Sequence, residues 1–94
     1  MALTITPREI EGVRILDLDG RLTAGDEVAK FREALTADSE AGHTKLILNL
    51  KGIDYIDSTG LGALVICFTR LRKAGGTLKL LHLNRRNIEL LVLT

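Results

Sequence analysis

The 94-residue sequence has very few aromatic residues and no excess of either charge. Phe31, Tyr55 and Phe68 are too few to build the stacking platform on which single-stranded nucleic acids bind. Lysine and arginine number 13 against 12 aspartate and glutamate, so the basic excess that attracts a domain to a phosphate backbone is missing as well. We therefore expect no nucleic-acid partner.

The chain also lacks disulfide partners and long apolar runs. Cys67 is the only cysteine, which fits a reducing compartment, and its apolar surroundings predict a small buried side chain. The longest run without a charged residue, 58–69, is far shorter than the roughly 20 residues that span a bilayer. The N-terminus has neither the basic start nor the apolar stretch of a signal peptide. These features predict a soluble, cytoplasmic protein without membrane insertion.

The motifs of several common enzyme classes are absent. The sequence contains no G-x-x-x-x-G-K-[ST] loop for nucleotide phosphates, and Ser58 does not stand in a G-x-S-x-G motif. His43 and His82 are the only histidines, and both are expected at the surface rather than beside a nucleophile. Two distant histidines and one buried cysteine do not make a metal site. We therefore predict a protein that is not an enzyme and that holds no cofactor or metal ion.

The spacing of apolar residues predicts two N-terminal strands followed by a helix. The strands are expected around residues 3–5 and 13–18. A helix capped by Thr23 is expected over residues 24–41, because apolar residues recur there at helical intervals. Asp38 is assigned to the solvated face of this helix. The apolar stripe on its other face consists of Val28, Phe31 and Leu35.

The second half of the chain continues the alternation of strands and helices. Residues 45–50 form a nearly continuous apolar run, typical of a central strand covered on both faces. A helix is expected over 58–74, a strand over 77–83 and a third helix over 85–93. The stripe expected to be buried on the second helix consists of Leu61, Leu64, Val65, Phe68 and Leu71. The order β-β-α-β-α-β-α predicts a single α/β domain with a mixed, mostly parallel sheet of four or more strands covered by helices.

The segment from Tyr55 to Gly62, YIDSTGLG, is the most informative part of the chain. It stands where the buried strand gives way to the second helix, and Asp57 or Ser58 can cap that helix through a side-chain oxygen. Gly60 and Gly62 each cost about 1 kcal/mol in a helix unless something approaches the backbone closely. Tight packing of the helix on the sheet and the approach of a partner both explain the glycines, and the local pattern leaves both open.

The hexapeptide DSTGLG at residues 57–62, after the strand 46–50 and the lead-in 53–56, resembles the STAS domain family. Within that family the likeness is closest to the bacterial anti-sigma factor antagonists. It covers essentially the whole chain, so residues 1–94 are expected to form one STAS domain. The resemblance implies that a partner anti-sigma factor, a serine kinase, phosphorylates Ser58 and that a PP2C-type phosphatase restores the serine. The unphosphorylated form then binds the anti-sigma factor and frees the sigma factor.

The motif and the resemblance together define an expected partner-binding surface. Ser58 is expected to be the phosphorylated residue, with Thr59 as a second candidate, while Asp57 orients the serine hydroxyl or caps the helix. Gly60 and Gly62 are expected to admit the partner. The rest of the surface is assigned to Leu61 and to the exposed side of the helix around Ala63, Ile66 and Thr69.

Two features depart from the family pattern. Thr23 stands where many antagonists carry an aspartate, and Asp26 comes three residues later, so the resemblance does not carry nucleotide or kinase contacts to that position. The chain ends at Thr94, where the family usually continues through a short strand and a final helix. An exposed apolar surface, with a homodimer as its consequence, is therefore a further expectation.

Two other functions remain open from the sequence. One is a non-catalytic STAS scaffold in a stress-signalling complex, or a STAS subunit of a lipid or anion transport system. Such modules often lack a switchable serine, so the intact residues 57–60 favour the antagonist. The other is a domain that binds a small ligand or nucleotide at the glycine-rich turn, which bound nucleotide in the purified protein would support.

Overall fold

The computed structural model describes the backbone of residues 3–93 and the side chains of residues 3–89. The expected domain limits, residues 1 and 94, lie outside the described part. The elements follow one another as β1 (Thr4–Ile10), β2 (Val13–Leu22), α1 (Asp26–Glu40), β3 (Lys45–Ile56), α2 (Ser58–Lys73), β4 (Thr77–Leu81) and α3 (Arg85–Leu93). This order confirms the predicted α/β arrangement β-β-α-β-α-β-α.

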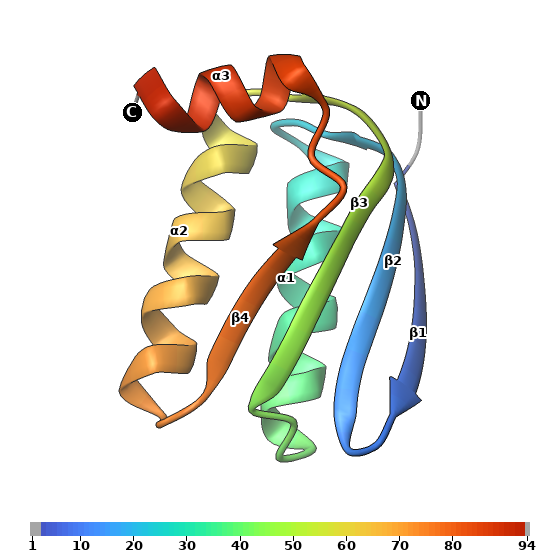
Figure 1. Cartoon of the computed structure of the whole chain (residues 1–94), viewed down its shortest axis with the longest axis vertical. Helices are drawn as coiled ribbons and strands as arrows, with labels where there is room; N and C mark the ends of the chain where they lie inside the picture. Colours follow the sequence, from blue (N-terminus) through green and yellow to red (C-terminus); the bar gives the residue numbers. More distant parts are fainter. Residues whose placement is uncertain (1–2, 94) are drawn as a thin grey trace.

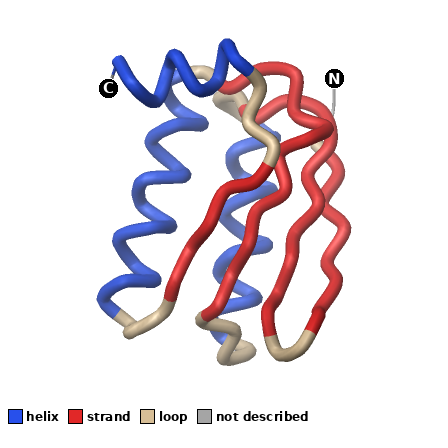
Figure 2. Tube along the Cα trace, in the orientation of Figure 1, coloured by secondary structure: helices blue, strands red, loops and turns tan. Residues whose placement is uncertain are grey.

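The four strands form one mixed sheet in the order β1-β2-β3-β4 (Figure 1). β1 pairs with β2 antiparallel, whereas β2 with β3 and β3 with β4 are parallel. When two crossover connections have the same handedness and run in the same direction across a sheet, their helices lie on the same face of it. α1 and α2 do lie on one face and contact each other, while α3 crosses the end of the sheet (Figure 2).

The prediction that the central strand is covered on both faces is therefore wrong. Leu46, Leu48 and Leu50 of β3 belong to the core that the sheet forms with α1 and α2. Ile47 and Asn49, which alternate with them, are only partly buried because neither α1 nor α2 covers their face. The nearly continuous apolar run of residues 45–50 therefore belongs to a strand with one buried face and one partly exposed face.

Asp17 of β2 links three strands on this open face. Its Oδ2 accepts a hydrogen bond from Arg8 Nε at 2.7 Å, and its Oδ1 accepts one from Asn49 Nδ2 at 2.8 Å. The bond from Arg8 first, and then the one from Asn49, hold the pKa of the Asp17 carboxyl below its ordinary value of 3.8. Exposed pairs of this kind add little to stability, so their main effect is to keep this face of the sheet polar.

Asp38 is the clearest departure from the predicted burial pattern of α1. The sequence pattern places it on the solvated face, yet it is only 6% exposed. Arg14 of β2 points toward the helices rather than toward solvent, and its Nη2 lies 3.2 Å from the Asp38 carboxylate. Removing the partner of a buried, paired carboxylate strongly destabilises the fold. The charge of Asp38 is visible in the sequence, but the partner that allows its burial is not.

The first turn of α1 also differs from the prediction. The helix begins at Asp26 with Gly25 at the N-cap position, so the side-chain cap expected from Thr23 is absent. Val28 and Phe31 are buried as predicted and Leu35 is partly buried against the core, so this stripe is the face that α1 turns to the sheet.

The buried face of α2 is rotated from the predicted stripe. Val65 and Phe68 are 53% and 43% exposed. Gly60, Ala63 and Cys67 are buried together with the predicted leucines, because α2 packs against α1 as well as against the sheet. Val65 and Phe68 instead line an apolar groove of about 270 Å³ between α2 and β4, together with Leu61, Leu64, Leu78 and Leu80. Self-association through this groove stays a prediction.

Cys67 is buried as predicted, and burial raises the pKa of its thiol to about 11 from the ordinary value of 9.0. Because the thiolate is the reactive form, two pKa units lower its abundance about 100-fold at pH 8. We expect iodoacetamide to alkylate the folded protein at roughly 1% of the rate of the urea-unfolded chain. Similar rates in the two states, measured by mass spectrometry, would contradict this burial.

Candidate functional site

Asp57 joins two loops at the edge of the sheet where the parallel strands end. Its backbone is extended and α2 begins at the next residue, Ser58. The Asp57 Oδ1 accepts a hydrogen bond from the Gly60 N–H at 2.7 Å, and Oδ2 accepts one from the Ala24 N–H at 2.9 Å. The carboxylate therefore caps α2 and also ties it to the loop between β2 and α1. Ligand and partner sites of parallel sheets lie at this same edge.

The hydrogen bonds to Asp57 decide its role. The bond from Ala24 first, and then the one from Gly60, hold the pKa of the Asp57 carboxyl below its ordinary value of 3.8. The side chain is therefore a carboxylate at neutral pH. Of the two roles expected for Asp57, capping the helix is the one that these bonds describe.

Replacing Asp57 by alanine removes the cap and the tie between the loops, and we expect the free energy of unfolding to fall by about 1–2 kcal/mol at pH 7. A carboxyl with a lowered folded pKa stabilises the fold above its unfolded pKa, and that contribution is lost as the pH falls below about 3.8. The stability difference between wild type and Asp57→Asn should therefore shrink from pH 7 to pH 3. Urea unfolding of these variants measures both effects. Asp54→Asn, at an exposed aspartate of the same segment, is the control and should change little.

Ser58 and Thr59 are exposed on the first turn of α2. The surface continues along the helix through the half-buried Gly62 and the exposed Ile66 and Thr69, which follow Ser58 at intervals of four, four and three residues. Such spacing places the residues on one side of a helix. Ile66 is 44% exposed, so this surface joins an apolar side chain to two hydroxyl groups at its end.

Three of the expected partner-binding residues are not on that surface. Ala63 is only 4% exposed, so its assignment to the exposed side of α2 is wrong, and Leu61 and Gly60 are buried too. A Cβ atom on Gly60 would collide with the backbone carbonyl of Leu22 at the end of β2. A Cβ atom on Gly62 would meet nothing within 4 Å. Gly60 therefore allows close packing of helix on sheet, and only Gly62 borders open space.

The first turn of α3 borders the same edge, a feature that the sequence reasoning missed. Asn84 Oδ1 accepts a hydrogen bond from the Asn87 N–H at 2.8 Å, and Asn84 Nδ2 donates one to the Ile53 carbonyl at 3.4 Å. The Arg86 guanidinium lies 4.5 Å from the centre of the Tyr55 ring. The signal that could have revealed the cap is an asparagine directly before an amphipathic helical run.

Comparison with known protein families identifies the family to which this chain belongs. A model of the STAS domain family matches residues 4–94. The chain belongs to the STAS domain family. This STAS domain is 44% identical over 64 residues to the anti-sigma-B factor antagonist of Bacillus subtilis strain 168. The match covers 68% of this chain and 58% of the relative, so it spans less than two thirds of the relative's length.

Solved structures share the STAS fold with this chain. SpoIIAA of Bacillus, an anti-sigma factor antagonist, has been solved in unphosphorylated and phosphorylated forms. The unphosphorylated form is 19% identical, has a TM-score of 0.78, and the match covers 97% of this chain and 84% of SpoIIAA. A Thermotoga maritima protein proposed to be an anti-sigma factor antagonist is 23% identical with a TM-score of 0.88, over 95% of this chain and 76% of that one. At these identities the likeness concerns the fold.

Within residues 3–93, no helix is long and apolar enough to cross a bilayer.

Proposed function

We propose that this STAS domain is an anti-sigma factor antagonist. In its unphosphorylated form it binds an anti-sigma factor that is a serine kinase, and phosphorylation of Ser58 releases it, which controls sigma-factor-dependent transcription. A PP2C-type phosphatase returns the domain to its binding form. The observation that carries this proposal is the exposed Ser58 on the first turn of α2, next to a carboxylate held by backbone N–H groups. The relationship to the anti-sigma-B factor antagonist supports the class of partner.

The position of Ser58 suits a reversible modification that leaves the fold intact. Its side chain is exposed, so a kinase reaches the hydroxyl without unfolding α2. A phosphate adds a charge of about −1.5 to −2 at neutral pH. Free backbone N–H groups and the helix dipole favour such a charge at the start of a helix. The modified domain is therefore expected to keep the same structure.

The same charge acts strongly on a bound partner. The neighbouring Asp57 is already ionised, because its hydrogen bonds lower the pKa of its carboxyl. A partner seated on Ser58, Gly62 and Ile66 then meets a second negative group at the centre of the contact. An unpaired, desolvated charge at an interface costs several kcal/mol, and about 2.7 kcal/mol weakens binding 100-fold. The switch thus needs no change of fold.

The test of this proposal is phosphorylation of the purified chain. We expect incubation with ATP and the serine kinase encoded nearest in the genome to add one phosphate, measured by intact-mass spectrometry and mapped to Ser58. Ser58→Ala should stay unmodified, whereas Thr59→Val, which removes the neighbouring exposed hydroxyl, should be modified like wild type. Absence of phosphate, together with a stable complex with another protein, would overturn the proposal in favour of the scaffold or transport-subunit function.

A further inference from the structure

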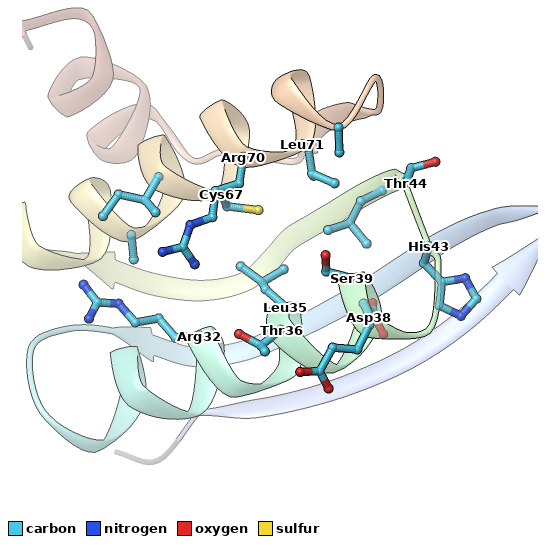
Figure 3. A pocket seen from close by; sticks show the side chains of 15 residues that line it. Arg32, Leu35, Thr36, Asp38, Ser39, His43, Thr44, Cys67, Arg70 and Leu71 are labelled. Carbon is cyan, nitrogen blue, oxygen red and sulfur yellow. The ribbon is translucent and has the colours of Figure 1, made fainter.

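A pocket of about 310 Å³ lies between α1 and α2 (Figure 3), and it shares Ile66 but not Ser58 with the proposed partner surface. It is formed mainly by the carboxyl-terminal half of each helix. Its volume falls at the lower end of the range of about 300–1,000 Å³ that is typical of small-molecule sites. The apolar part of its lining includes Leu35, Leu46, Ala63, Ile66, Cys67 and Leu71. The short side chains of α2 in this set leave the space unfilled.

The charged groups of the pocket are separated along its length. Figure 3 shows Arg32 of α1 and Arg70 of α2 toward one end of the pocket and Asp38 toward the other. Asp38 is already paired with Arg14, whereas Arg32 and Arg70 form no ion pair with any side chain of residues 3–89. Glu40 also lines the pocket, but it is two turns of α1 from Arg32, about 12 Å along the helix. One end of the pocket therefore carries two guanidinium groups that no described carboxylate pairs with.

We infer that this pocket binds a small amphiphilic carboxylate, such as a medium-chain aliphatic acid. The carboxylate lies between the two guanidinium groups of Arg32 and Arg70, and the hydrocarbon part lies on the apolar lining. Guanidinium groups bind carboxylates through two parallel, charge-assisted hydrogen bonds, which an alcohol of the same length does not offer. Each buried methylene strengthens binding about fourfold, so the length of the hydrocarbon chain determines the affinity. The two arginines select a ligand with a negative charge.

The site is independent of the proposed phosphorylation. Ser58 does not line the pocket, and Arg70 follows it by twelve residues, about 18 Å along α2, so a phosphate on Ser58 does not reach the arginine end where the carboxylate binds. Ser58→Ala should therefore bind the acid as wild type does. This independence keeps a failure of one proposal distinct from a failure of the other.

The test is a titration of isotopically labelled protein with sodium octanoate, followed by backbone amide chemical shifts. We expect saturable shifts confined to residues 32–46 and 63–74, with one dissociation constant. Octanol, which lacks the charge, should bind at least about tenfold more weakly. Hexanoate, shorter by two methylenes, should bind about 15-fold more weakly than octanoate. Absence of saturable shifts with octanoate, or equal binding of octanol, would overturn the inference.

Two double variants, each of which removes two arginine charges, give a second test. Arg32 and Arg70 are both exposed, so Arg32→Gln/Arg70→Gln is expected to fold, and it should bind octanoate at least about tenfold more weakly with little change for octanol. Arg72→Gln/Arg85→Gln removes the same charge outside the pocket lining and should bind octanoate like wild type. Equal losses in the two double variants would show a non-specific charge effect and would sink the proposed site.

Discussion

Ser58→Asp should bind the anti-sigma factor about 100-fold more weakly than wild type, while being at least as stable. The added carboxylate lies beside Asp57, which is ionised, and a partner that covers Ser58 has to desolvate it. In the free protein the same carboxylate lies on the first turn of α2, where the helix dipole stabilises it by about 0.3–1 kcal/mol. Opposite changes in binding and stability separate a charge switch from simple damage to the fold. Isothermal titration and urea unfolding measure the two quantities.

Two control variants sharpen the Ser58→Asp experiment. Ser58→Ala keeps the surface neutral, so it should bind like wild type and remain bound in the presence of ATP and the kinase. Thr4→Asp adds the same charge at an exposed position on β1, at the edge of the sheet away from β4, and should leave the affinity unchanged. A Ser58→Asp variant that binds as tightly as wild type would rule out the charge switch.

Gly60→Ala should lower the free energy of unfolding by about 3 kcal/mol, the upper end of the range for overpacked sites. The new methyl group would collide with the backbone carbonyl of Leu22. Backbone atoms cannot rotate away as a side chain does, and that carbonyl also accepts a hydrogen bond from the Asp57 N–H at 3.3 Å. Either α2 lifts from the sheet or the end of β2 moves, and both disturb the segment that presents Ser58.

Gly62→Ala is the matched control, two residues further along the same helix. A methyl group there meets nothing within 4 Å, and alanine favours the helix by up to about 1 kcal/mol over glycine. We therefore expect Gly62→Ala to be neutral or stabilising in urea unfolding. Its binding measures whether the partner approaches the α2 backbone, because a close contact at Gly62 would weaken the complex without weakening the fold. Equal destabilisation by both substitutions would contradict the assigned roles of the two glycines.

The order of strands and helices and the start of α2 could be predicted from the sequence because they depend on near neighbours. Helical spacing around Val28 and Phe31 and the cap at Asp57 involve residues within a few positions of one another. The motif at residues 57–62 is equally local, so the family and the exposed Ser58 followed from it. The first turn of α1 is the exception, since Thr23 offers a cap that the chain does not use.

The burial of particular side chains required the tertiary structure. Val65 and Phe68 belong to a stripe that suits a helix lying on a sheet, but contact with α1 turns Ala63 and Cys67 inward instead. Asp38 is buried because Arg14, which is 24 residues away in the sequence, comes to lie beside it. Periodicity reports that a helix has an apolar side, not which neighbours it packs against.

The fold class, the family and the serine that the proposed switch uses all follow from short-range patterns in the sequence. Three features became visible only in the folded chain: both crossover helices share one face, Asp57 also holds Ala24, 33 residues away, and a pocket opens between α1 and α2 with two arginines that form no ion pair within residues 3–89. The physical reason is the same in each case. Contacts between distant segments depend on how all the elements pack together, and no local stretch of sequence contains that information.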